Sequence, residues 1–240
     1  MSALERLRPS VAVISARGGS KRFPRKNIAP FFGVPIIVHT IRAALEARCF
    51  ERVVVSTDDE EIATIARENR AEIDVRPEHL ATDAAGVVDV CLDLLRRERG
   101  LGRSYRTFCA LYPTAPLRNA ADIVATMSLL DPGQCDFAMA VTEYDLPPYR
   151  ALRENADGTL EPMWPEWAFV KSQQAPILRV NNASTYAATV DAFERMKTFT
   201  GPGCRGHFMP RARSTDIDYP EDLDEARAKA SRLGWREIAG

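Results

Sequence analysis

The sequence predicts an α/β fold with a doubly wound, mostly parallel sheet, and two observations support that prediction. Short apolar runs alternate with longer segments of helical periodicity up to residue 142, which is the pattern of successive βαβ units. A basic loop with two glycines directly follows the first apolar run, at the kind of strand end where open α/β sheets bind ligands. A chain of 240 residues can bury a sizeable core, so residues 1–240 are expected to form a single domain.

The individual elements are predicted in chain order from composition and periodicity. Strands are expected at the short apolar runs 11–14, 52–56, 106–111, 136–142 and 183–190. Helices are expected where apolar residues recur at three- and four-residue spacing, at 36–48, 59–70, 87–98, 120–130 and 220–232. Thr57 or Asp58 is the expected N-cap of the second helix, because a short polar side chain can accept from the free N–H groups of the first turn.

The pattern changes after residue 142. Prolines at 147, 148, 162, 165 and 176, with Asp157-Gly158 between them, predict a hairpin-rich extension at about 143–180 instead of another βα unit. Apolar residues such as Trp164 and Phe169 are too many here for a solvated loop. They are therefore expected to pack on the parent domain or on a second subunit.

Net charge and cysteine usage argue against several functions. The formal net charge is −1, so no global basic field suggests a nucleic-acid partner. Five cysteines and three histidines are scattered, with no C-x-x-C pair and no zinc-like spacing. The odd number of cysteines and their apolar neighbours favour reduced packing residues in a cytoplasmic protein. The sequence has no signal-like opening and no run of about 18 apolar residues, so no membrane partner is expected.

The loop after the first strand reads Ser15-Ala16-Arg17-Gly18-Gly19-Ser20-Lys21-Arg22-Phe23-Pro24-Arg25-Lys26-Asn27, a composition that suits a polyanion. Its glycines permit positive φ and close approach, so that backbone N–H groups can turn toward phosphate oxygens. A plain basic surface turn is the alternative, but the position at a strand end favours phosphate binding. The chain has no G-x-x-x-x-G-K-[ST] and no G-x-G-x-x-G after this strand, which excludes a Walker loop and disfavours dinucleotide binding.

A second candidate site lies in Thr215-Asp216-Ile217-Asp218-Tyr219-Pro220-Glu221-Asp222. If this segment is extended, the two-residue period puts Asp216 and Asp218 on one face. Two carboxylates on one face suit Mg²⁺, which completes its shell with water and phosphate oxygens. The alternative is an acidic first turn for the helix at 220–232, a role that Glu221 and Asp222 fit better than Asp216 does.

The residues alone leave the roles of three other segments open. Leu111-Tyr112-Pro113-Thr114-Ala115-Pro116-Leu117-Arg118 directly follows a predicted core strand, and its prolines fix a rigid turn at the carboxyl edge of the sheet. Arg76-Pro77 and residues 80–83 are either plain loop or a rim that touches a nucleotide. Lys171-Ser172-Gln173-Gln174 is a loop on composition. No G-x-S-x-G context for a nucleophilic serine occurs in the chain.

These segments occur together, and in this order, in the acylneuraminate cytidylyltransferase family (the CMP-sialic acid synthetases), which the chain resembles from residue 11 to about 226. The resemblance depends on residues 16–21, 24–27, 56–58, 76–77, 113–116 and 216–218. Residues 150–166 and Lys171-Ser172-Gln173 resemble the pseudaminic acid branch of that family.

The resemblance implies a nucleotide-diphospho-sugar transferase-like, Rossmann-like fold and a CTP-dependent activity. Enzymes of this family use CTP and Mg²⁺ to make a CMP-activated nonulosonic acid, a carboxylated nine-carbon sugar, and they release pyrophosphate. They usually dimerise through an extension at this place in the chain. The implied partners are therefore CTP, an acidic nine-carbon sugar and a second copy of the chain, with Mg²⁺ as cofactor.

The resemblance also implies roles for individual residues. The nucleotide would be held by the loop and one rim residue: Ala16, Arg17, Gly18, Gly19, Ser20, Lys21, Lys26, Asn27 and Arg76. The residues expected to be catalytic are Arg17, Lys21, Asp216 and Asp218. The two aspartates would hold Mg²⁺. The residues expected to contact the sugar are Thr114, Lys171 and Gln173, and Lys171 would pair with its carboxylate.

The sequence departs from the family at positions that face the sugar or the base. Sialic-acid enzymes carry two serines, a glutamine and two arginines, in that order, where this chain has Ala85, Val87, Tyr112, Lys171 and Ser172. The pseudaminic branch usually carries Asp-Ala-Gly-Gln-Phe-Tyr-Trp where this chain reads Asn-Asn-Ala-Ser-Thr-Tyr-Ala at 181–187. These departures leave the reaction type intact and the identity of the sugar open. Two alternatives remain: a cytidylyltransferase for 3-deoxy-octulosonate, and a nucleotide- or sugar-binding relative without catalysis.

Overall fold

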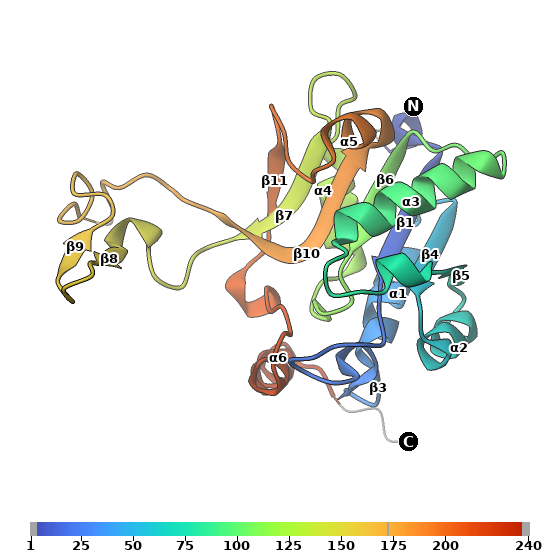
Figure 1. Ribbon diagram of the computed structural model, residues 1–240, viewed down its shortest axis with the longest axis horizontal. Coiled ribbons are helices and arrows are strands. Elements are labelled where there is room, and N and C mark those ends of the chain that lie inside the picture. Colours follow the sequence, from blue (N-terminus) through green and yellow to red (C-terminus); the bar gives the residue numbers. More distant parts are fainter. Residues whose placement is uncertain (1–3, 172, 237–240) are drawn as a thin grey trace.

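The computed structural model describes residues 4–171 and 173–236, and a seven-stranded sheet forms its centre (Figure 1). From one edge to the other the strands are β11 (Arg205–Phe208), β7 (Phe137–Thr142), β10 (Val180–Thr189), β6 (Thr107–Leu111), β1 (Ser10–Ser15), β4 (Arg52–Thr57) and β5 (Glu72–Val75). β1 pairs in parallel with β4 and β6, β4 with β5, and β7 with β11, whereas β10 runs antiparallel to β6 and β7. The predicted mostly parallel sheet is confirmed, with β10 as its antiparallel member.

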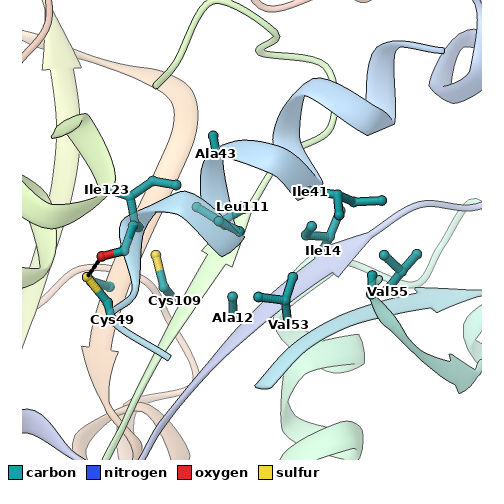
Figure 2. Packing of buried hydrophobic residues seen from close by; sticks show 14 of the residues in the cluster. Ala12, Ile14, Ile41, Ala43, Cys49, Val53, Val55, Cys109, Leu111 and Ile123 are labelled. Carbon is teal, nitrogen blue, oxygen red and sulfur yellow. Dashed lines mark hydrogen bonds between the residues drawn. The ribbon is translucent and has the colours of Figure 1, made fainter. Parts of the chain in front are cut away.

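Helices cover both faces of the sheet, as in a doubly wound fold. They are α1 (Ile36–Ala47), α2 (Glu60–Glu68), α3 (Val87–Gly100), α4 (Ala120–Ser128) and α5 (Val190–Met196), and the chain's remaining α-helix in the described residues is α6 (Pro220–Arg232). Alternate residues of β1 belong to two core layers. Ala12 and Ile14 pack with α1, α2 and α4 (Figure 2), while Val11 and Val13 pack with α3 and α5. Because both faces of β1 are buried, the strand is apolar at successive positions instead of alternating with polar residues.

The C-terminal helix α6 spans the predicted residues 220–232. Its buried face packs on a third apolar cluster that includes Phe31, Leu117 and Ile217. Ile217 lies in the extended segment before the helix, and Leu117 lies in the turn after β6. The cluster therefore holds these two distant segments together at one edge of the molecule.

The N-cap of α2 is Asp59, whose side chain accepts from Ile62 N at 3.0 Å. The prediction of Thr57 or Asp58 is wrong because both side chains have other partners. Thr57 Oγ1 accepts from Asp59 N at 3.1 Å, and Asp58 Oδ1 accepts from Gly18 N at 3.0 Å. Asp58 thus binds the loop after β1 instead of capping the helix.

Two strands of the central sheet and one α-helix were not predicted from the sequence. β5 and β11 are four-residue edge strands with no buried residue and with polar or charged side chains at alternate positions, so they lack the apolar run that indicates a central strand. α5 is only seven residues long and follows β10 without a break, so its first residue, Val190, looks like the end of the strand. At the other end, β10 begins at Val180, before the predicted residue 183.

The predicted hairpin of the extension is present. β8 (Leu152–Glu154) and β9 (Leu160–Pro162) pair antiparallel, and Gly158 in their turn has a φ of 81°. The extension stands away from the sheet in Figure 1. Its exposed large apolar side chains are Leu146, Leu152, Leu160, Met163, Trp164, Phe169, Ile177 and Leu178. Packing of these side chains on the parent domain is therefore not observed, and packing on a second subunit stays a prediction.

None of the helices in residues 4–171 and 173–236 is long and apolar enough to cross a membrane.

The five cysteines are free, and Cys49, Cys91, Cys109 and Cys135 are buried. Burial raises the pKa of the Cys49 thiol to about 11. This cysteine, which belongs to the core cluster in Figure 2, therefore acts as an apolar packing residue, as the sequence predicted.

Candidate active site

Two cavities meet at the carboxyl side of the central strands, and we call them the basic cavity and the acidic cavity after their charged linings. The basic cavity has a volume of about 370 Å³ and lies past the ends of β1, β5 and β6. Its cationic side chains are Arg17, Arg22, Lys26 and Arg76. The acidic cavity has a volume of about 540 Å³, and its carboxylates are those of Glu143, Asp145, Asp216, Asp222 and Glu225. Asp216 lines both cavities.

One of the two glycines in the loop at 16–27, Gly18, packs closely against the start of α2. A Cβ added to Gly18 would lie 2.5 Å from Asp59 Oδ2, so a side chain here would displace the cap of α2. Gly19 has no such neighbour. Of the two properties that glycine permits, close approach is observed at Gly18, whereas the positive φ of the loop is that of Arg25, at 60°. The loop therefore follows the start of α2 closely.

Two buried polar side chains, Asn27 and Arg76, line the basic cavity. Asn27 Nδ2 donates to the Arg17 carbonyl at 3.0 Å, and Arg76 Nη2 donates to Ser15 Oγ at 2.8 Å and to the Ser56 carbonyl at 2.7 Å. Asn27 Oδ1 and Arg76 Nε are buried and have no partner among the described atoms. Burial also lowers the pKa of Arg76. The side chains of Asn27 and Arg76 are thus fixed at the cavity by hydrogen bonds to the ends of β1 and β4 and to the loop.

A carboxylate of the cavity rim binds two cations of the loop. Arg17 Nη1 lies 2.6 Å from Asp83 Oδ1, and Lys21 pairs with the other oxygen of the same carboxylate. Lys21, and to a smaller extent Arg17, holds the pKa of Asp83 below its ordinary value. Asp83 thus belongs to the rim of the basic cavity, and contact of residues 80–83 with a nucleotide stays a prediction.

The other cations of the loop divide between the site and the surface. Lys26 Nζ lies 2.7 Å from Asp218 Oδ1, and Arg22 Nη2 lies 2.9 Å from Asp218 Oδ2. Arg25 instead pairs with Asp59 and with Glu61. Of the residues predicted to hold a nucleotide, those that line the basic cavity are Arg17, Ser20, Lys26, Asn27 and Arg76. The predicted residues that lie behind or beside this lining are Ala16, Gly18, Gly19 and Lys21.

Asp216 and Asp218 share one face of their segment, as predicted. Both line the basic cavity, whereas Ile217 between them is buried. The helix-capping alternative belongs to Asp222, whose Oδ2 accepts from Asp218 N at 2.8 Å and from Tyr219 N at 2.7 Å. Asp222, and not Asp216 or Asp218, therefore accepts the backbone hydrogen bonds at the start of α6.

Asp216 is held by a neutral partner. Thr114 Oγ1 donates to Asp216 Oδ1 at 2.6 Å. Burial raises the pKa of Asp216 above its ordinary value, the Thr114 hydrogen bond opposes that shift, and the charge of Asp218 adds to it. No lysine, arginine or histidine within the described ranges pairs with the Asp216 carboxylate, in contrast to Asp218.

This donor set fits a divalent cation such as Mg²⁺. Two carboxylates face one cavity, and one of them, Asp216, is partly buried and forms no ion pair with a described cation. No group of three or more His, Cys, Asp or Glu side chains in residues 4–171 and 173–236 could form a metal cage. Mg²⁺ usually takes one or two carboxylates and fills its shell with water and phosphate oxygens, so Asp216 and Asp218 would suffice.

The acidic cavity is formed by residues 142–146, which we call the root of the extension because the extension begins there, by the start of β10 and by the segments around α6. Its two cations are Arg211, which pairs with Asp145, and Lys229, which pairs with Glu225 at 2.6 Å. Lys229 Nζ also donates to Thr215 Oγ1 at 2.9 Å. Sequence reasoning missed both cations because they come from segments without a local motif.

The residues predicted to bind a sugar are not gathered in one place. Thr114 lines the basic cavity, whereas Lys171 and Gln173 are exposed on the extension and are not among the described lining residues of either cavity. Several of the departures from the resembled family do lie at the cavities. Those in the basic cavity are Ala85, Val87 and Tyr112, and those in the acidic cavity are Asn181, Asn182 and Ala183. Ser172 lies outside the described residues.

Comparison with known proteins gives consistent results. Residues 11–142 match the Cytidylyltransferase family. The chain is 32% identical over 220 residues to a pseudaminic acid cytidylyltransferase of Campylobacter jejuni, covering 91% of this chain and 94% of the relative. It is also 32% identical over 216 residues to a CMP-N,N'-diacetyllegionaminic acid synthase of Legionella pneumophila, covering 88% and 92% of the two chains.

Solved structures support the fold. A CMP:2-keto-3-deoxy-manno-octonic acid synthetase, solved in complex with CTP, superposes with a TM-score of 0.70 at 17% identity and covers 94% of this chain and 99% of its own. A 4-diphosphocytidyl-2C-methyl-D-erythritol synthase from Anaerococcus prevotii superposes with a TM-score of 0.68 at 12% identity, covering 97% and 100%. At these identities the likeness extends to the fold alone.

Proposed function

The chain belongs to the cytidylyltransferase family, and from this premise we propose that it transfers CMP from CTP to an acidic nine-carbon sugar and releases pyrophosphate. The observation that carries the proposal is the meeting of the two cavities at Asp216. One cavity is lined by cations suited to a triphosphate, and the other is large enough for a sugar. The two relatives at 32% identity are named for pseudaminic and legionaminic acids, which supports a nonulosonic acceptor over 3-deoxy-octulosonate.

The proposed reaction is an in-line substitution at phosphorus. The anomeric hydroxyl of the sugar attacks the α-phosphorus of CTP, the bond from that phosphorus to the bridging oxygen breaks, pyrophosphate leaves and the hydroxyl proton passes to solvent. Such a reaction depends mainly on positioning and on neutralising phosphate charge. Arg17 and Lys21 would exchange Asp83 for the phosphates and stabilise the leaving pyrophosphate.

Asn27 and Arg76, which line the basic cavity, would help to seat the nucleotide. Both side chains are buried and are held by hydrogen bonds to Arg17, Ser15 and Ser56, so each would meet the nucleotide from a fixed position. Lys26 would balance the charge of Asp218 close to the phosphates. Mg²⁺ would be held by Asp216 and Asp218, and when bound it polarises phosphoryl oxygens and lowers the pKa of a nearby hydroxyl.

The acidic cavity would take the sugar. Glu143 and Asp145 would accept from sugar hydroxyl groups, and Lys229 and Arg211 are the cations of this lining that could pair with the sugar carboxylate. Lys229 is favoured because its side chain is 21% exposed, against 52% for Arg211, and a less solvated cation binds an anion more strongly. The sugar contacts predicted for Lys171 and Gln173 would require a second chain, since both lie on the extension.

We also infer that the extension forms a homodimer. Phe169 is 94% exposed and Ile177 is 81% exposed, and an apolar cavity of about 260 Å³ is lined by Tyr149, Trp164, Trp167, Pro176 and Leu178. A second copy of this surface would bury both features, as the isologous contact of a twofold dimer requires. Ile177→Asp should shift the protein toward a monomer in sedimentation velocity. An unchanged sedimentation coefficient would exclude this interface.

The catalytic proposal is tested by a pyrophosphate-release assay with CTP, UTP, ATP and GTP. The acceptors are pseudaminic, legionaminic, N-acetylneuraminic and 3-deoxy-octulosonic acids. We expect release with CTP and a nonulosonic acid, and a product with the mass of the CMP-sugar. Turnover of the octulosonic acid alone would establish the first alternative. Absence of release with every acceptor would favour a binding protein without catalysis.

A further inference from the structure

Two hydrogen bonds join the turn after β6 to the segment that carries Asp216. Ile217 N donates to the Thr114 carbonyl at 2.9 Å, and Thr114 Oγ1 donates to Asp216 Oδ1 at 2.6 Å. Backbone and side chain of one threonine therefore hold a segment about a hundred residues away in the sequence. The second bond ends on the one carboxylate that lines both cavities.

The turn that presents Thr114 is itself braced. Arg118 is 2% exposed, and its Nη1 donates to the Ser184 carbonyl at 2.7 Å and to the Tyr112 carbonyl at 3.3 Å. This guanidinium links the turn to β10, the strand that borders the acidic cavity. Thr114 is also buried, at 6% exposure, so its hydroxyl is offered from a fixed position.

The two candidate metal ligands are held in different ways. Asp218 is bound by the cations Lys26 and Arg22, which cancel part of its charge. The described partner of the Asp216 side chain is the neutral hydroxyl of Thr114. A neutral donor fixes the direction of a carboxylate and leaves its negative charge available to a cation, and such outer partners orient ligands and tune metal affinity.

We propose that Thr114 is a positioning residue for the metal-binding carboxylate of Asp216, and not a direct sugar contact. Its hydroxyl has a single proton, which is committed to Asp216 Oδ1, and the remaining lone pairs of the carboxylate stay free for a divalent cation. The inference rests on the metal role of Asp216 in the proposed function. In this role Thr114 affects metal affinity directly, and it affects sugar binding only through its hydrogen bond to Asp216.

The test measures Mn²⁺ binding to the protein without CTP or sugar, from the loss of the free-Mn²⁺ signal in electron paramagnetic resonance. Thr114→Val should weaken Mn²⁺ binding by about tenfold or more, because it removes an outer-shell hydrogen bond. Thr114→Ser keeps the hydroxyl and should bind Mn²⁺ nearly as the wild type does. Thr126→Val is the matched control, since it removes another buried hydroxyl, which donates to the Asp122 carbonyl at 2.8 Å.

Three outcomes would overturn the inference. Mn²⁺ binding unchanged by Thr114→Val, together with a raised KM for the sugar, would make Thr114 a direct sugar contact. Equal weakening by Thr126→Val would reduce the effect to general destabilisation. Wild-type protein that binds Mn²⁺ no better than Asp216→Asn would have no site for Thr114 to serve. Because no substrate is present in this measurement, its failure is distinguishable from absence of pyrophosphate release, which tests the proposed function.

Discussion

The basic and acidic cavities differ in how the chain builds them. The basic cavity is formed mainly by one contiguous loop and by turns at the ends of parallel strands, while the acidic cavity collects the root of the extension, the antiparallel β10 and the segments around α6. A loop at a strand end can carry phosphate-binding chemistry within a short stretch of sequence. The acidic cavity can change its lining through the extension and β10 without altering that loop, so the proposed sugar site can vary while the proposed phosphate site stays the same.

The largest expected effect comes from the residue that the two cavities share. Asp216→Asn removes the charge of the carboxylate that has no cationic partner, so turnover should fall about 1000-fold at low Mg²⁺, given that a metal contributes several kcal/mol to such reactions. Pyrophosphate release measured against Mg²⁺ concentration checks the prediction. Asp224→Asn on α6, where the side chain is 80% exposed, is the control. An unchanged Mg²⁺ requirement in the Asp216 variant would mean that Asp216 does not hold a metal ion where the two cavities meet.

A second variant tests the basic cavity alone. Lys21→Ala should lower turnover about 100-fold, the usual loss when one charge-stabilising donor is removed. Thermal unfolding should not change, because the Lys21 side chain is 82% exposed. Arg25→Gln is the matched control on the same loop, since its guanidinium pairs with Asp59 and Glu61 instead of the cavity rim. A near-normal rate for Lys21→Ala would contradict the phosphate assignment.

The same difference between the cavities explains what the sequence could predict. The loop at 16–27 and the pair Asp216 and Asp218 are short local patterns, and the structure brings both to the basic cavity. Asp83 had no pattern of its own, and its role depends on a fold that brings it to Arg17 and Lys21. Cavity residues that come from distant segments of the chain can be identified only from the three-dimensional fold, because no local pattern marks them.

The fold shows a parallel contrast. Central strands such as β1 are buried on both faces and have an apolar run that single-sequence periodicity detects. The edge strands β5 and β11 lie at the two ends of the sheet and keep exposed polar residues, so their pairing is decided by tertiary contacts. Lys229 belongs to a helix that was predicted correctly, yet nothing in its spacing indicates that it faces a cavity.

A third variant tests the acidic cavity. Lys229→Gln should raise the KM for the sugar about tenfold, the range expected for losing one charge-assisted hydrogen bond. The KM for CTP should stay unchanged, since Lys229 lines the acidic cavity and is not among the described lining residues of the basic cavity. The control is Arg227→Gln on the same helix, where the guanidinium pairs with Asp224 and donates to the Pro30 carbonyl. Equal changes in both KM values would show that the two cavities do not act separately.

The smallest expected effect has the opposite sign. Asp83 pairs with Arg17 and Lys21, so it competes with a triphosphate for both cations. Asp83→Asn removes this competitor, and the KM for CTP should fall about threefold, in keeping with the small free energy of an exposed ion pair. The KM for the sugar should not change. Raised ionic strength should shrink the difference between variant and wild type, because salt screens exposed charges. If Asp83→Asn instead raises the KM for CTP, the Asp83 carboxylate does not compete with the triphosphate for the loop cations. It would then help CTP to bind, by contacting the nucleotide directly and by holding the loop cations in place.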